Sequence, residues 1–444
     1  MNIVEYLEGL SRDIGRRARV GFFGLGISNM ALIRALPRGY PFTVRSDAAE
    51  LVPCILPEKV YLGARALAEI DEDVLFLSPS TRRDRPELIG AQQKGARLMS
   101  DCELFFTDEH ELYAVTGSDG KSTTSTLAKE LLPNSALVGN IGVPFTEAPI
   151  SERYVAELSS FQLEYCVPRA RRAILTSLSE NHLNWHTSYE EYREAKLSLL
   201  RKADEAVIPI SAVGEVGDLH PYAVFGRMPL DAARGLISAE HYITLDDGVI
   251  AYDGEPQIEL LCLQRREWYN IENFMGAVAL SSGLCTRGDI VRLGESFTGL
   301  SHRAELFFSV RGRDFINSSI DTTPKRCSAT LEALGRRVFL ILGGRGKGLS
   351  PDCMLPAIKK YAEGLALYGE AGLELLPYIT DLGVPAEYYE SFFPAVDYAV
   401  RSASEGSAIL LSPAATGYGE FASFAERGDA FKAYIRSKFR AEGV

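Results

Sequence analysis

The chain has 444 residues and a formal net charge of −12 at neutral pH, with 46% of its residues apolar and 24% charged. This composition is that of a globular protein rather than a disordered or fibrous one, and the length allows several domains with cores of their own. The acidic balance argues against nucleic acid as a partner, which would require a basic face, but it permits a small anionic substrate held by local cations.

Cysteine usage and hydropathy indicate where the protein resides. The seven cysteines include no C-x-x-C pair, so neither a zinc site nor a disulfide framework is indicated, and reduced thiols are expected. No apolar run reaches the ~18 residues of a membrane helix. The N-terminal segment mixes acids and bases where a signal peptide would be basic and then apolar. We therefore expect a cytoplasmic protein that has no membrane partner.

Strand-like and helix-like segments alternate along most of the chain, which predicts α/β layers with largely parallel sheets. The first block, residues 1–106, opens with an apolar strand at residues 19–24 that runs into a glycine turn and a helix over residues 29–36. Short apolar runs at residues 43–45 and 74–78 predict two more strands of the same sheet. We expect a Rossmann-like domain here.

Two further blocks follow. The second, residues 107–301, contains a strand from Leu112 into another glycine turn, later strands at residues 154–158, 173–177 and 206–210, and an irregular stretch over residues 212–265 that holds short strands. It is predicted to be an α/β ATPase domain built around a phosphate loop. The third, residues 302–444, has two buried-strand signals, at residues 338–343 and 408–412, and is predicted to be a second Rossmann-like domain.

The strongest single motif is Val115-Thr-Gly-Ser-Asp-Gly-Lys-Ser-Thr-Thr124, between a predicted strand and a predicted helix. Gly117 and Gly120 allow backbone N–H groups to turn toward an anion, and the helix that begins near Lys121 directs its positive dipole end to the same place. The lysine can reach terminal phosphates, and the hydroxyl of Ser122 or Thr123 can bind Mg²⁺. The alternative is a tight strand-to-helix turn with a surface lysine.

Lys196 lies on the inward face of another predicted helix. At roughly 100° per residue, Tyr189, Tyr192, Leu199 and Leu200 share one arc of this helix, and Lys196 falls inside it. An ammonium group on an inward face needs a partner or a chemical reason. The alternative is a lysine whose stem extends to water.

Further motifs occur in a fixed order along the chain. They are Gly139-Asn-Ile-Gly142, Glu157-Leu-Ser-Ser-Phe-Gln-Leu-Glu164, Asn181-His-Leu-Asn-Trp-His186, Tyr192-Arg-Glu-Ala-Lys196, Gly343-Gly-Arg-Gly-Lys347, Ser412-Pro-Ala-Ala-Thr416 and Phe424-Ala-Glu-Arg-Gly428. With the shortened phosphate loop, this ordered set resembles the Mur ligases and folylpolyglutamate synthases from about residue 20 to 435. The segment from Glu157 and the one from Ser412 are most similar to the branch that joins D-glutamate to UDP-N-acetylmuramoyl-L-alanine.

The resemblance implies an ATP-dependent carbon–nitrogen ligase of peptidoglycan precursor synthesis that forms an acyl-phosphate, uses two Mg²⁺ ions and acts as a monomer. Rival interpretations are a member of the family that adds L-alanine, L-glutamate or a diamino acid, and a non-catalytic nucleotide-binding relative. The resemblance also implies ATP contacts from Gly117, Ser118, Asp119, Gly120, Lys121, Ser122, Thr123, Asn270, Asn273 and Arg303.

Metal and catalytic roles follow from the same resemblance. Ser122, Glu157, His182 and Lys196 are expected to serve the metals, with Lys196 carbamylated and therefore anionic, and Lys121, His182 and Lys196 are expected to be catalytic. An acid at the end of an apolar strand suits Mg²⁺, which prefers oxygen ligands. The alternatives are a helix-capping acid at Glu157 and a hydrogen-bonded loop histidine at His182.

Substrate contacts are expected in the first two blocks and in the last. UDP-N-acetylmuramoyl-L-alanine is assigned Gly26, Ile27, Arg45, Ser46, Asn140, Ser159 and Gln162, and D-glutamate is assigned Thr322, Lys347, Thr416 and Phe424. The turn Gly24-Leu-Gly26 could instead hold a nicotinamide dinucleotide or be purely structural.

The chain departs from the family pattern at several positions: Ser80 replaces a glycine, Tyr269 a histidine, Ser318 an acid, Ile320 a lysine and Gly417 a serine. These changes leave the identity of the amino acid more open than the reaction, and Asp321 is a candidate to replace the missing acid.

Overall fold

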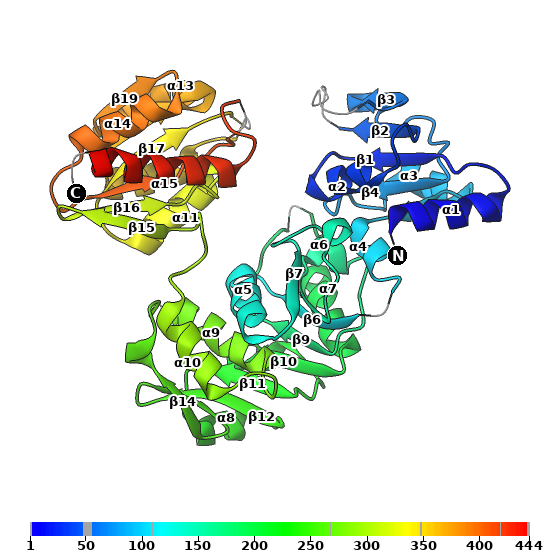
Figure 1. The fold of residues 1–444 in the computed structure, drawn as a ribbon, viewed down its shortest axis with the longest axis horizontal. Coiled ribbons are helices and arrows are strands. Elements are labelled where there is room, and N and C mark those ends of the chain that lie inside the picture. The colour runs from blue at the N-terminus through cyan, green and yellow to red at the C-terminus, as the bar shows by residue number, and fades with distance from the viewer. Residues whose placement is uncertain are drawn as a thin grey trace. The chain divides into compact units, whose positions relative to one another are not determined.

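The computed structural model describes residues 2–47, 56–108, 110–183, 185–266, 268–346, 349–417 and 419–441. Within them the chain forms three separate sheets with helices packed against them (Figure 1), which confirms the predicted α/β class. Two sheets belong to one compact unit, Met1–Phe297, and the third to a second unit, Thr298–Val444. The predicted domain boundaries at residues 106 and 301 stay predictions. None of the described helices has both the length and the apolar character to cross a membrane.

The first sheet has five parallel strands in the order β3-β2-β1-β4-β5. Its elements are α1 (Ile3–Ile14), β1 (Val20–Phe23), α2 (Ile27–Ala35), β2 (Phe42–Ser46), β3 (Lys59–Leu62), β4 (Val74–Leu77), α3 (Pro86–Gln93), β5 (Arg97–Met99) and α4 (Asp101–Phe105). Every residue of β1 and β4 is buried, as expected for central strands of a parallel sheet.

The second sheet has nine strands among the described residues, in the order β14-β13-β12-β11-β10-β9-β6-β8-β7, and only the β12-β13-β14 meander is antiparallel. Its strands are β6 (Glu111–Thr116), β7 (Ser135–Gly139), β8 (Arg153–Glu157), β9 (Arg172–Leu175), β10 (Glu205–Pro209), β11 (Ala223–Gly226), β12 (His241–Asp246), β13 (Val249–Tyr252) and β14 (Glu255–Glu259). Its helices are α5 (Lys121–Leu131), α6 (Ser160–Leu163), α7 (Tyr189–Lys202), α8 (Leu230–Leu236), α9 (Trp268–Leu280) and α10 (Arg287–Ser296).

The third sheet has the order β15-β16-β20-β17-β18-β19 and is parallel apart from the β15-β16 hairpin. Its elements are β15 (Glu305–Val310), β16 (Arg313–Asn317), α11 (Pro324–Leu334), β17 (Val338–Gly343), α12 (Leu355–Tyr361), β18 (Ala362–Tyr368), α13 (Gly369–Ile379), β19 (Ala386–Tyr389), α14 (Phe392–Ser402), β20 (Ala408–Leu411) and α15 (Phe424–Ala441). Short 3₁₀ helices occupy Gly63–Arg65, Phe145–Glu147, Ile210–Glu215, Leu260–Cys262, Asp352–Met354 and Thr380–Leu382.

The strand register of the second sheet brings chemically important strand ends together. Val115, near the end of β6, pairs with Glu157 at the end of β8 and with Ile174 of β9. Gly139 at the end of β7 pairs with Glu157 from the other side. Parallel strands end at a common edge, where open α/β sheets bind ligands. The glycine turn after β6 and the carboxylate after β8 therefore lie side by side.

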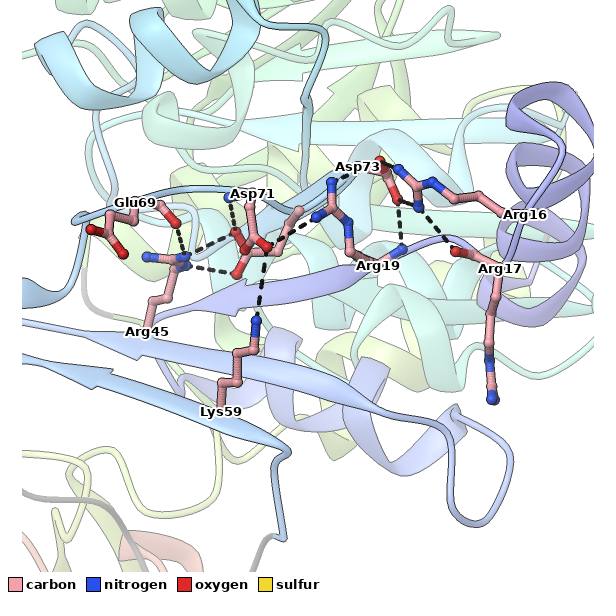
Figure 2. Close-up of polar contacts among 9 residues, drawn as sticks. Arg16, Arg17, Arg19, Arg45, Lys59, Glu69, Asp71 and Asp73 are labelled. Atoms are coloured by element: carbon pink, nitrogen blue, oxygen red, sulfur yellow. Dashed lines mark hydrogen bonds and ion pairs between the residues drawn. The ribbon is translucent and has the colours of Figure 1, made fainter.

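Arg45, at the end of β2, is fully buried and all five of its N–H donors are used inside the first sheet's layer. Its guanidinium forms a bidentate pair with Glu72, with Nε–Oε1 and Nη2–Oε2 distances of 2.8 Å and 3.0 Å. The remaining donors reach the carbonyls of Ala66, Ala68 and Glu69, as Figure 2 shows for the last of these. The prediction that Arg45 contacts the nucleotide is therefore wrong, because no donor is left for a ligand.

The Arg45–Glu72 pair should be a major stabilising element of the first sheet. Arg45→Lys keeps the charge but loses the fork, so buried acceptors are left without donors, at about 1–3 kcal/mol for each. Thermal unfolding followed by calorimetry measures this change. Arg19→Ala removes an exposed ion pair with Asp71 (Figure 2) and should leave the midpoint nearly unchanged. An Arg45→Lys variant as stable as the Arg19→Ala variant would contradict the assignment.

Candidate active site

A loop with two constrained glycines joins β6 to α5. Gly120 has a left-handed φ of +82°, and a Cβ there would lie 2.1 Å from Oδ1 of Asn273. A Cβ on Gly117 would lie 2.0 Å from Oγ1 of Thr176. Only glycine fits either position, and the loop consequently turns tightly into the N-terminus of α5. The backbone N–H groups and the positive dipole end of this helix can receive an anion such as a phosphate.

Hydrogen bonds to the segment after β9 fix the shape of the loop. The N–H groups of Ser118 and Asp119 donate to the carbonyl and the Oγ of Ser177, both at 2.9 Å. Thr176 Oγ1 donates to the carbonyl of Asp119 at 2.5 Å, and the Ser118 and Tyr192 hydroxyls are 2.8 Å apart. Ser118 and Asp119 therefore shape the loop, and the N–H groups positioned to meet an anion are those of the first turn of α5.

Two lysine amines meet at one backbone oxygen of this loop. Lys121 Nζ donates to the carbonyls of Gly117 and Ser118, each at 2.8 Å. Lys196 Nζ, on α7, donates to the same Gly117 carbonyl at 2.8 Å and lies 4.6 Å from the centre of the Tyr192 ring. The Lys196 side chain is 1% exposed. The helical arc that placed Lys196 on an inward face is confirmed.

The surroundings of Lys196 favour its neutral form. Burial lowers the pKa of the Lys196 amine well below its usual value, and the positive charge of Lys121 lowers it further, while Asp119 and Glu157 act in the opposite direction. A neutral amine is a nucleophile, whereas an ammonium ion is not. The two lysines therefore differ in their surroundings, because Lys196 is buried beside Lys121 and its pKa is lowered.

Glu157 is a buried carboxylate with one open oxygen. Its side chain is 1% exposed, and its Oε1 accepts a hydrogen bond from Asn140 Nδ2 at 2.8 Å. Its Oε2 is buried without a hydrogen-bond partner among the residues that the structure describes. An unpaired buried carboxylate oxygen is costly unless a cation meets it. The donor set therefore fits a hard divalent cation such as Mg²⁺.

His182 lies on an exposed turn. Its backbone has a left-handed φ of +54°, which is uncommon for a residue other than glycine. Its ring makes an edge contact with Phe161, with centroids 5.0 Å apart, and lies 6.4 Å from the ring of Tyr192. Tyr192 in turn contacts Lys196. Lys121, Glu157 and Lys196 thus lie at one edge of the sheet, and the approach of His182 to a metal there stays a prediction.

The other residues predicted to contact the nucleotide lie on several different elements. Asn273, on α9, lies against Gly120, and its Oδ1 is 3.4 Å from Thr124 Oγ1. Asn270 is on the first turn of the same helix. Ser122 and Thr123 open α5, as predicted. Arg303 belongs to the second unit, so its contact with ATP stays a prediction.

The residues of the first unit that are predicted to contact the substrate lie at helix N-termini and at a strand end. Gly26 caps the N-terminus of α2, and Ile27 beside it is 75% exposed, which leaves this turn open. Ser159 and Gln162 form a reciprocal capping box at the start of α6, a motif that the sequence S-x-x-Q alone could have indicated. Ser46 ends β2. Contacts of these residues with substrate stay predictions.

The second unit contains a buried arginine for which we predicted no role. Arg427 is fully buried and donates to both the carbonyl and the Oγ of Ser319, to the carbonyls of Gly343 and Ala415, and to the Tyr368 hydroxyl. These acceptors lie at the carboxyl ends of four neighbouring strands. This guanidinium, which has no carboxylate partner among the described residues, thus connects the strand ends whose loops are predicted to bind the amino acid.

The predicted amino-acid contacts lie on or near these loops. Thr416 exchanges backbone hydrogen bonds with Arg345, and Phe424 accepts a bond from Ser319 through its carbonyl. Thr322 follows β16. Lys347 lies outside the described residues. Asp321 is buried and accepts a hydrogen bond from Ser412 at 2.7 Å, and burial raises the pKa of its carboxyl.

Comparison with known proteins places the chain in a class. The Mur ligase middle domain matches residues 115–213, the segment that carries the phosphate loop, Glu157, His182 and Lys196. The computed fold is similar to a UDP-N-acetylmuramate-alanine ligase from Thermotoga maritima, with a TM-score of 0.57 and 18% identity over 95% of this chain and 100% of that chain. The matched segment is that of a Mur ligase middle domain, and the fold is that of a Mur ligase structure.

Sequence relatives give the branch of the class. A UDP-N-acetylmuramoylalanine–D-glutamate ligase from Acetivibrio thermocellus is 31% identical over 95% of this chain and 97% of its own length. A ligase of the same name from Ruminiclostridium cellulolyticum is 30% identical over 97% of this chain and 99% of its length. The chain belongs to the family of UDP-N-acetylmuramoylalanine–D-glutamate ligases.

Gly120→Ala should weaken ATP binding by about tenfold or more, because a Cβ both strains the left-handed backbone and displaces Asn273. Calorimetric titration with a non-hydrolysable ATP analogue measures the affinity. Gly235→Ala is the matched control, because this helical glycine has open space around it, and it should bind the analogue normally. Unchanged affinity in the Gly120→Ala variant would remove this loop from the nucleotide site.

Proposed function

We propose that the chain uses ATP to join D-glutamate to the carboxyl group of UDP-N-acetylmuramoyl-L-alanine, a step of peptidoglycan precursor synthesis. The observation that carries the proposal is the open, buried oxygen of Glu157 beside a glycine loop with two converging lysines. The names of the two bacterial relatives support the choice of substrates. A cytoplasmic location and a monomeric state stay predictions.

The donor set at this edge suits Mg²⁺. Glu157 would hold the ion through Oε2, and Ser122, His182 and a carbamylated Lys196 would complete its surroundings. The bound ion supplies charge neutralisation for the phosphate oxygens. The role of the chain is to fix the ligands, as the Asn140 hydrogen bond does for Glu157.

The reaction requires positioning more than covalent chemistry by the protein. The substrate carboxylate attacks the γ-phosphorus of ATP, the bond to the β-bridging oxygen breaks, and an acyl-phosphate and ADP form. The amine of D-glutamate then attacks the acyl carbon, loses a proton, and phosphate leaves. Lys121 contributes its positive charge to the transferred phosphoryl group, and the first turn of α5 contributes N–H donors.

Lys196 has the surroundings of a lysine that takes up carbon dioxide. Its neutral amine would add to the carbon of CO₂, form an N–C bond and release one proton, which yields an anionic carbamate. This conversion replaces a buried neutral amine by an anion next to Lys121, so it gives the Lys121 side chain a group of opposite charge and gives Mg²⁺ an oxygen ligand.

Lys121→Ala should abolish ADP release that depends on both UDP-N-acetylmuramoyl-L-alanine and D-glutamate. Loss of a charge contact of this kind costs about 3–4 kcal/mol of barrier, a factor of several hundred. A coupled ADP assay measures the rate, and Lys129→Ala, on an exposed position of the same helix, is the control. Full activity in the Lys121→Ala variant would exclude the phosphate loop from the reaction.

The carbamate can be observed directly. Protein equilibrated with ¹³C-bicarbonate should give one carbamate resonance that is absent in Lys196→Ala, and small carboxylates should partly restore activity to that variant. Lys129→Ala should keep the resonance. A fully active Lys196→Ala enzyme would refute the assignment.

The amino acid is the least constrained part of the proposal, because Ile320 and Gly417 replace polar residues of the family pattern. We expect D-glutamate to give the highest kcat/KM in a panel that also contains L-alanine, L-glutamate and a diamino acid, with phosphate release as the readout. A different preferred amino acid would leave the proposed ligase reaction standing and would assign the chain another amino-acid substrate. Nucleotide binding without turnover of any of them would instead indicate a non-catalytic relative.

A further inference from the structure

The turn that carries His182 is attached to the loop that follows β4 of the first sheet. Trp185 Nε1 donates to the carbonyl of Ser80 at 2.6 Å, and Arg82 Nη1 donates to the carbonyl of Trp185 at 2.8 Å. The Arg82 guanidinium also lies 5.0 Å from the centre of the Trp185 ring. Two hydrogen bonds and a cation–π contact thus hold one residue of the turn from both sides.

Trp185 transmits this attachment to His182. The N–H groups of Trp185 and His186 both donate to the carbonyl of His182, at 2.9 Å and 3.0 Å. The rings of Trp185, His182 and His186 pack around Phe161, with centroids 4.5 Å, 5.0 Å and 5.8 Å from it. The left-handed backbone of His182 is therefore held by a closed turn on an aromatic platform, and it needs such support because its φ is unfavourable.

Arg82 reaches the helix of Lys196 as well. Its Nη1 donates to Oε1 of Glu191 at 2.9 Å, in the first turn of α7, and its Nη2 lies 2.7 Å from Asp84. Hydrogen bonds from Arg82 and Thr187 help to lower the pKa of the Glu191 carboxyl to about 2, against the opposing effect of burial. One guanidinium therefore connects the turn after His182 with the N-terminus of the helix that carries Lys196.

The residues around Arg82 could also be considered as a metal site. Ligand atoms of Glu164, His186 and Glu191 lie within 4.8 Å of one another, and Nδ1 of His186 is buried without a hydrogen-bond partner in the described part of the chain. Arg82 is already bonded to Glu191 and attracts Glu164. A divalent ion would have to displace this guanidinium, so the cation of the cluster is the arginine itself.

We propose that Arg82 and Trp185 are positioning residues, which attach the turn of His182 to the loop after β4 and so hold His182 in place for Mg²⁺. The inference rests on the proposed function for the role of His182. It adds that the first sheet contributes to the metal edge of the second. The loop after β4 is itself fixed to the glycine turn of the first sheet, because Ser78 N–H donates to the carbonyl of Phe23.

Two variants test the attachment in different ways. Arg82→Ala removes the bonds to Trp185 and Glu191, and Trp185→Phe keeps a ring on Phe161 but loses the bond to Ser80. Each should raise the half-saturating Mg²⁺ concentration for turnover by about tenfold, the usual effect of losing a residue that orients a metal ligand. Each should also speed backbone hydrogen exchange in peptides covering residues 181–191. In the Arg82→Ala variant, Mg²⁺ could bind Glu164 and Glu191 once the guanidinium is gone. Trp185→Phe retains Arg82, so the same shift in both variants excludes this artefact.

The chain offers a matched control for contact between the same two layers. Arg34 on α2 pairs with Glu147, which follows β7, at 2.6 Å, away from the turn of His182. Arg34→Ala should leave both Mg²⁺ dependence and exchange at residues 181–191 unchanged. A similar shift in Arg34→Ala, or wild-type behaviour in both Arg82→Ala and Trp185→Phe, would overturn the proposal. Altered exchange in a chain without ligase turnover would leave the attachment standing and reject the proposed function.

Discussion

The meeting of two lysine amines at the Gly117 carbonyl is the contact on which the rest of the site depends. It requires a loop so tight that no side chain fits at Gly117, and it requires α7 to direct Lys196 inward over that loop. Two ammonium groups at one oxygen repel each other, and little water screens them. Burial and the positive charge of Lys121 accordingly lower the pKa of the Lys196 amine, and the proposed carbamate would place an anion beside Lys121 instead.

The parallel sheet itself positions the other parts of the site, which are the Glu157 carboxylate and the Asn140 amide that bonds to it. β6 and β8 are neighbours in register, so the loop after β6 and the carboxylate that ends β8 share an edge. Asn140, which follows the next strand, reaches the Oε1 of Glu157 and leaves Oε2 open. A sheet of this kind assembles a cation site from residues that are distant in sequence, since each strand contributes whatever follows its last residue.

Local sequence patterns predicted the features that depend on residues close together in the chain, such as strands, helix faces and glycine turns. The apolar runs became β1, β4, β8, β17 and β20 within about two residues, which is the usual accuracy for element ends. Helical spacing placed Lys196 inward, and glycine spacing located the tight loop between β6 and α5. The stretch over residues 212–265 was less well described, since it contains the short helix α8 in addition to strands, and seven residues are too few to show a clear helical period.

Long-range pairing explains what the sequence could not predict. At the end of a strand beside a glycine turn, Arg45 has the pattern of a phosphate ligand, and its true partner, Glu72, is 27 positions away. Arg427 is similar, because its acceptors come from four separate loops that only the folded sheet brings together. Neither environment leaves a trace in the residues next to the arginine.

Among the residues that the structure describes, the buried cations Arg45, Arg427 and Lys196 differ in how fully their N–H donors are hydrogen-bonded. Arg45 and Arg427 each have acceptors for all five N–H groups, and a guanidinium keeps its charge throughout the physiological pH range. Lys196 has a single acceptor among the described residues and a cationic neighbour, so its buried charge is poorly compensated. An amine in that position can lose its proton, which a guanidinium cannot do. Full hydrogen bonding stabilises the two buried guanidinium groups in their charged form, whereas its lack at Lys196 favours the neutral amine that the proposed carbamate requires.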